Sequence, residues 1–245
     1  MIKFFRIIRQ RMLTENRASK YLLYAIGEIV LVVIGILIAL QINTWNQDRV
    51  NRKMEKKILI DLRQELSTNK EKVRKAIERR ENLYEPLGRY MKLMVKDSIS
   101  YSSFSEIHQK TFFSSKISPS FGVINSLISS GEVNLISNDS LKYLVTDWRD
   151  VIAVFMYIED NSFAGHRRFE EYFDKVFPLM GNQFHNKSLE DLRVRFEKII
   201  DDIEYRNRLI TIGQHFEAAN LNGHETIDYI DRMTNLIDRE LEKMN

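Results

Sequence analysis

The longest apolar run in the chain lies near its N-terminus, where residues 21–42 read YLLYAIGEIVLVVIGILIALQI. Only Glu28 and Gln41 are strongly polar, and the stretch from Ile29 to Leu40 is uninterruptedly apolar. A helix of this length extends about 33 Å, enough to cross a hydrocarbon core of about 30 Å. The helix has no polar face for water, which disfavours a buried helix of a soluble protein. No small-residue cleavage pattern follows it, which disfavours a cleaved signal peptide. The pattern predicts a retained transmembrane helix.

Beyond this span, apolar residues recur at three- and four-residue steps, the period of an amphipathic helix. The first such stripe covers residues 54–94 and predicts one long helix that continues from the span and can kink before Pro86. A serine-rich stretch at residues 98–120 follows, with several phenylalanines in it. These aromatic residues predict an ordered loop with a short helix, packed on the bundle, rather than a free linker.

Three further signals mark helix boundaries in the second half of the chain. Gly131 is placed to end a short helix, and Asn138 or Asp139 to cap the next one, which can break near Gly165. Another N-cap is expected at Lys187-Ser188, before a stripe that continues to Phe216.

Asn222-Gly223 then separates this stripe from a final amphipathic helix that reaches the C-terminus. No stretch of the sequence alternates as strands do. We therefore predict an all-α fold, in which a single N-terminal transmembrane helix is followed by a long-helix antiparallel bundle. The expected organisation is a basic amphipathic tail at 1–20, the transmembrane helix at 21–42 and a helical extramembrane domain at 43–245.

Charge predicts the orientation of the span. Residues 1–20 carry six basic side chains against Glu15, a net of +5, while the whole chain is +3. Since Glu28 contributes −1, residues 43–245 have a net charge of about −1, which disfavours a nucleic-acid-binding domain. The positive-inside rule places the N-terminus in the cytoplasm and the large domain in the periplasm, although five basic residues at 49–57 lie just beyond the span.

Two groups of residues are predicted to contact the membrane. The basic and aromatic side chains of the tail suit an anionic leaflet surface, and aromatic rings near the two ends of the span suit the headgroup level. The surface group is Lys3, Phe4, Phe5, Arg6, Arg9, Arg11, Arg17 and Lys20. The interfacial anchors are Tyr21, Tyr24 and Trp45.

Glu28 is the one carboxylate within the span, which contains no lysine or arginine, and such groups normally face protein or water rather than lipid. Helical spacing places Val32, Gly35 and Ala39 on its face, and Gly35 with Ala39 forms a small-xxx-small pair. These four residues predict an intramembrane helix–helix interface. Two alternatives remain open, namely a Glu28 reached by water at the cytoplasmic side and a Glu28 that couples ion movement.

The sequence offers little for catalysis. The absence of cysteine excludes disulfides, thiolate metal sites and cysteine nucleophiles, and there is no phosphate-binding loop or hydrolase motif. Of the five histidines, His166 lies four residues before Glu170 and can share a helix face with it, which is too little for a predicted metal site. We predict no catalytic, cofactor-binding or metal-binding residues, no cofactor, no evident small-molecule substrate and no enzymatic activity.

The N-terminal region resembles a known family. The run from MIKFFRIIRQ through NRASKYLLYAIGEIVLVVIGILIALQINTWNQ is similar to the opening of a family of uncharacterised single-pass inner-membrane proteins of Gram-negative bacteria. Its members begin with a basic FFR-type tail and a span reading GEIxLVVxGILIALQxNxWN. The stretch LISSGEVNLISNDSLKYLVTDW resembles a second recurrent element of that family. The resemblance implies an inner-membrane location and no particular activity.

Together these features lead to two hypotheses. The first is a non-enzymatic, membrane-anchored interaction or scaffold module that contacts the lipid bilayer and binds its own copies or another envelope protein. The alternative is an accessory subunit of a transport or ion-coupled membrane complex in which Glu28 takes part.

Overall fold

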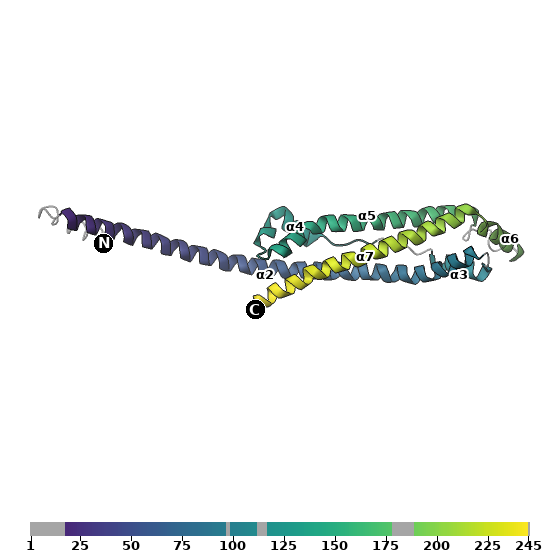
Figure 1. Ribbon diagram of the computed structural model, residues 1–245, viewed down its shortest axis with the longest axis horizontal. Helices are drawn as coiled ribbons and strands as arrows, with labels where there is room; N and C mark the ends of the chain where they lie inside the picture. The colour runs from purple at the N-terminus through teal and green to yellow at the C-terminus, as the bar shows by residue number, and fades with distance from the viewer. Residues whose placement is uncertain (1–17, 97–98, 112–116, 178–188, 245) are drawn as a thin grey trace. The chain divides into compact units, whose positions relative to one another are not determined.

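The computed structural model describes residues 18–96, 99–111, 117–177 and 189–244. Within these ranges every regular element is helical and none is a strand, so the predicted all-α class is confirmed (Figure 1). The chain divides into two compact units, Met1–Glu55 and Lys56–Asn245.

Six α-helices and one 3-10 turn are present in the described residues. They are α2 (Ala18–Val95), α3 (Tyr101–Thr111), α4 (Gly122–Ser130), the 3-10 turn η1 (Glu132–Leu135), α5 (Asp139–Val176), α6 (Leu189–Ile200) and α7 (Ile203–Lys243). The single long helix predicted from the span into the first stripe is confirmed, and α2 continues through Pro86. The short helix expected in the serine-rich stretch is α3.

In the second unit, α5, α7 and the α2 residues from Lys56 onward form a bundle of long helices (Figure 1). Helix α7 runs antiparallel to α2, because Lys70 binds Asp231 while Arg80, further along α2, binds Asn220, earlier in α7. Helix α7 is also antiparallel to α5 (Figure 1), so α2 and α5 run in the same direction. The chain therefore crosses back along the bundle between α2 and α5.

Two predicted helix ends are confirmed by their local geometry. Gly131 follows α4 with a φ of +76°, the left-handed conformation that glycine adopts without steric cost. Asn138 caps α5, since its side chain accepts a hydrogen bond from the Leu141 backbone N–H at 2.9 Å. The cap expected at Ser188 lies outside the described residues.

Other predicted boundaries are wrong. Helix α5 does not break at Gly165, and α7 passes through Asn222-Gly223 as one helix. The stripe that we expected to run unbroken to Phe216 is instead divided between α6 and α7, where the Asp202 side chain caps α7 by accepting from Glu204 N at 2.7 Å.

Close helix packing explains why the glycine at 223 does not end a helix. A Cβ on Gly223 would lie 3.0 Å from Cγ1 and Cδ1 of Ile77, a buried α2 residue. The missing side chain therefore lets α7 approach α2, and the glycine serves helix contact rather than chain reversal.

The bundle buries two separate core clusters. One is mainly aliphatic and is centred on Leu59, Leu62, Leu66, Trp148, Phe155, Ile230 and Met233. The other is mainly aromatic and includes Tyr90, Phe104, Phe169, Phe173, Phe177, Phe196 and Tyr205. Apolar stripes on α2, α5 and α7 meet in both, so the amphipathic pattern of the sequence corresponds to real buried faces.

Candidate functional site

The apolar part of α2 is long and apolar enough to cross a membrane, and none of that window is buried within the described protein. Large side chains along it are widely open, for example Leu31 at 71% and Leu37 at 58% exposure. A continuous apolar surface of this kind is compatible with membrane anchoring.

The four predicted interface residues lie along this exposed helix. Val32, Gly35 and Ala39 are exposed, and Glu28 is half-buried. A Cβ on Gly35 would meet no other heavy atom within 4 Å, and the same is true of Gly27. The face is therefore open at Gly35, while the pairing of two such helices stays a prediction.

The predicted membrane-contact residues are only partly within the described chain. Tyr24 and Trp45 are 61% and 66% exposed, and the Arg49 guanidinium carbon lies 6.0 Å from the Trp45 ring centroid. This cation–π contact places a basic group next to Trp45, the aromatic anchor predicted for the second end of the span. Lys20 and Tyr21 lie on α2. Outside the described residues are Lys3, Phe4, Phe5, Arg6, Arg9, Arg11 and Arg17.

In the middle of the bundle, a buried ion pair connects all three long helices. The Arg80 guanidinium of α2 donates to Glu159 Oε1 of α5 at 2.6 Å and to Asn220 Oδ1 of α7 at 2.6 Å. Both charged side chains are almost fully buried, at 10% and 7% exposure. Burial raises the pKa of Glu159, and the positive charge of Arg80 opposes that shift. The sequence analysis did not single out this pair.

A second buried polar group lies in the aromatic cluster. His108 Nδ1 is 2.7 Å from the Phe104 carbonyl, its Nε2 is 3.3 Å from the Tyr205 hydroxyl, and that hydroxyl is 2.9 Å from the Tyr90 hydroxyl. Burial lowers the pKa of His108 to about 4 and raises that of Tyr90 to about 12. All three groups are therefore neutral near pH 7, so the chain of contacts orders α3 against α2 and α7 without carrying charge.

A third polar contact holds the first turn of α4. Glu65 of α2 accepts hydrogen bonds from the backbone N–H groups of Val123 and Ile124, at 2.8 and 3.2 Å. A carboxylate at a helix N-terminus satisfies donors that have no partner in the helix, and it suits the positive end of the dipole. Glu65 thus connects α4 to α2.

One sequence signal could have revealed these residues. Asn69 and Arg80 continue the three- and four-residue spacing of buried Leu62, Leu66 and Val73 on α2. A polar residue at a stripe position predicts a buried polar contact with another element, because such groups are rarely buried without one.

The His166 and Glu170 pair predicted from spacing does form. His166 Nε2 lies 3.2 Å from Glu170 Oε1, in a geometry poorly aligned for a hydrogen bond, and the His166 side chain is 2% exposed. Burial lowers the pKa of His166, and Glu170 only partly opposes the shift. Among the described residues, no group of three or more histidine, aspartate or glutamate side chains is arranged to hold a metal ion.

Comparison with known proteins supplies no relative. No protein-family model matches the chain, and no curated protein or solved structure matches it significantly.

Proposed function

We propose that the protein is a membrane-anchored helical interaction module of the bacterial inner membrane, of the single-pass family that its N-terminal region resembles. One observation carries the proposal. The uncovered apolar segment and the first helix of the bundle belong to the same element, α2. A bilayer would cover the first part, and the second part is already covered by α5 and α7.

The polar centres of the bundle support a binding rather than a catalytic role. Arg80 binds Glu159 of α5 and, on α7, the Asn220 side chain and the Ala219 carbonyl. Glu65 binds the start of α4. These charges are used to join helices. A domain fixed in this way presents a stable surface, on which we propose that its own copies or another envelope protein bind.

Reporter fusions test the orientation. Alkaline phosphatase, which is active only in the periplasm, is fused after Asn245, and green fluorescent protein is fused there in a parallel strain. We expect phosphatase activity and no fluorescence, because the basic tail retains the N-terminus in the cytoplasm. Fluorescence without phosphatase activity would contradict the orientation and, with it, a periplasmic partner.

A matched glycine pair tests self-association through the span. We expect Gly35→Ile to weaken association of the full chain more than Gly27→Ile, because Gly35 shares a helix face with Glu28 and Gly27 lies about 100° away. Cross-linking in membranes, followed by size analysis, measures the effect. Equal losses at the two glycines, or none at either, would contradict the proposed interface.

Mass spectrometry of detergent-extracted complexes separates this function from the alternative. The interaction module predicts copies of the chain or a soluble or anchored envelope protein. Recovery of a multispan transporter in stoichiometric amount would instead favour the alternative, in which the protein is an accessory subunit and Glu28 takes part in transport.

A further inference from the structure

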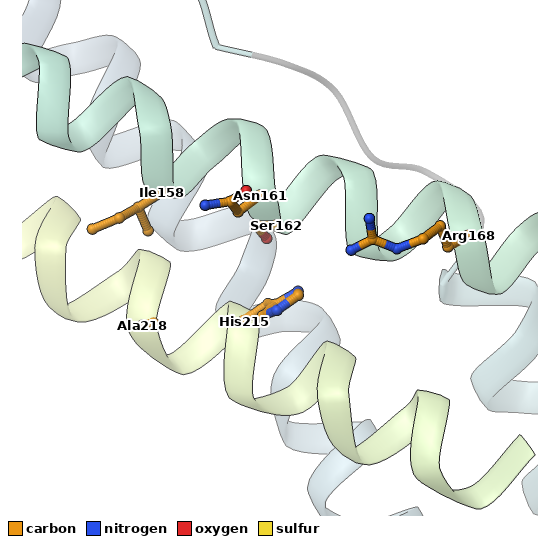
Figure 2. A pocket seen from close by; sticks show the side chains of 6 residues that line it. All are labelled: Ile158, Asn161, Ser162, Arg168, His215 and Ala218. Carbon is orange, nitrogen blue, oxygen red and sulfur yellow. The ribbon is translucent and has the colours of Figure 1, made fainter. Parts of the chain in front are cut away.

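A cleft between α5 and α7 lies well away from the predicted membrane contacts in the sequence. Its volume is about 230 Å³, and Figure 2 shows the side chains that surround it. The lining residues are Ile158, Asn161, Ser162 and Arg168 of α5, with His215 and Ala218 of α7. In Figure 2 the Arg168 side chain extends back along α5 toward Ser162, and the His215 ring projects from α7 toward the same space.

The polar side chains of this cleft have unused hydrogen-bonding groups. Within the described part of the chain, no hydrogen bond or ion pair is formed by the side chain of Asn161, Ser162, Arg168 or His215. His215 Nδ1 is itself buried and without a partner. This nitrogen packs against Gly165 of α5, whereas the side chains of Asn161, Ser162 and Arg168 keep donors that can bind a ligand in the cleft.

The hydroxyl of Ser162 is another cleft group that forms no hydrogen bond within the described residues. The residue is only 7% exposed. Hydroxyls elsewhere on these two helices, such as those of Thr146 and Thr211, donate to the carbonyl four residues earlier. Ser162 makes no such bond, which leaves its hydroxyl available to the cleft.

Gly165 makes room for the histidine. A Cβ at this position would lie 2.4 Å from His215 Nδ1, closer than any real contact. The absence of a side chain on α5 therefore lets the His215 ring pack between the helices, beside the cleft.

The chemistry of the lining defines the ligand. Arg168 carries a permanent positive charge, and the serine hydroxyl, the asparagine amide and a histidine N–H are further donors. No carboxylate lines the cleft, whereas Ile158 and Ala218 give it an apolar part. We propose that this cleft binds a short-chain organic carboxylate, with the carboxylate on Arg168 and Ser162 and the hydrocarbon chain against Ile158 and Ala218. This site is independent of the orientation of the span and adds a ligand to the proposed interaction module.

Calorimetric titration of the full chain in detergent micelles with sodium butyrate tests the site, with empty micelles as the blank. We expect saturable binding to the wild-type chain. Removing a charged hydrogen bond costs about 1.5–3 kcal/mol, so Arg168→Gln should weaken butyrate binding by about 10- to 100-fold. Ser162→Ala should also weaken it, and sodium phosphate at the same ionic strength should bind less well, because it has no apolar part.

Arg167→Gln is the matched control. Arg167 is the adjacent arginine and is exposed, as Arg168 is, but it does not line the cleft and its guanidinium lies 3.9 Å from Glu171. It should leave butyrate affinity unchanged. Helix content and melting temperature of each variant, from circular dichroism, show that the fold is retained. The proposal is overturned by an absence of saturable binding, by equal losses in the two arginine variants, or by phosphate binding as tightly as butyrate.

Discussion

The side chain of Asn69 forms two hydrogen bonds with the backbone of Ser120. Its Nδ2 donates to the Ser120 carbonyl at 2.8 Å, and its Oδ1 accepts from the Ser120 N–H at 2.7 Å. Asn69 is fully buried, so these bonds are shielded from water. Together with Glu65, one turn earlier, this contact fixes the chain where it enters α4 and explains how a segment without regular structure can lie along a hydrophobic bundle.

Replacing Asn69 should destabilise the bundle. We expect Asn69→Leu to lower the free energy of unfolding by about 2 kcal/mol or more, because two backbone groups of Ser120 lose their partner at about 1–3 kcal/mol each. Thr68→Ala is the control, since this exposed neighbour bonds only to Gln64 of its own helix and should change stability by about 0.5 kcal/mol or less. Urea denaturation followed by circular dichroism measures both. Equal effects would show that the Ser120 contact contributes little.

The Arg80 and Glu159 pair should be more sensitive to the loss of one partner than to the loss of both. Each of Arg80→Met and Glu159→Met leaves a buried charge unpaired and should cost about 3–5 kcal/mol. The double variant should cost clearly less than the sum, because no charge remains in the core. A double-mutant cycle from denaturant midpoints checks this, and additive single effects would contradict coupling.

His108 should make stability depend on pH. Its pKa is about 4 in the folded protein, because of burial, and near 6.5 when unfolded. Between these values the unfolded chain binds the proton and the folded chain does not, so stability falls as the pH is lowered from 6.5 to 4. The loss attributable to His108 is about 3 kcal/mol, since each pKa unit corresponds to about 1.4 kcal/mol.

Two histidine variants separate the contribution of His108 from those of the other groups that titrate between pH 7 and pH 4. His108→Gln cannot gain a proton, so its free energy of unfolding should fall less than that of the wild type between pH 7 and pH 4. His224→Gln, which changes an exposed histidine, should retain the wild-type slope. An unchanged slope in His108→Gln would show that this histidine titrates normally.

Two glycines should respond to alanine with opposite signs. A Cβ on Gly88 meets nothing within 4 Å, so Gly88→Ala should stabilise α2 by about 0.5–1 kcal/mol through helix propensity. At Gly223 the same methyl would press on the buried Ile77, and overpacking of a core costs about 1–3 kcal/mol. Thermal melts should rise for the first variant and fall for the second. A rise in both would mean that Ile77 moves aside freely.

Much of the local structure could be predicted because it depends on near neighbours. The apolar run of the span can be read directly from consecutive residues. The stop at Gly131 and the cap at Asn138 each involve backbone groups only three residues away. Helix period is likewise a local property, so the all-α class follows from the spacing of apolar residues.

The errors occur where local and tertiary preferences differ. Asn222-Gly223 is a turn signal in isolation, yet both residues are helical in α7 because α2 packs against the space left by the glycine. The actual helix boundary is at Asp202, and the sequence does not reveal this cap because the apolar stripe continues past it.

The cleft between α5 and α7 also combines residues that are close in the sequence with a residue that only tertiary packing brings near. Ser162 and Arg168 are six residues apart on α5, but His215 comes from α7, and no spacing in the sequence predicts that it joins them. The sequence by itself determined which segments are helical, which one is apolar throughout, and where the basic charge lies, since these properties depend on residue order alone. Only the tertiary structure decided which polar residues are buried and what they bind. Asn69 reaches Ser120, Arg80 reaches Glu159, and Ser162 lines a cleft with His215 only when segments distant in the sequence pack together.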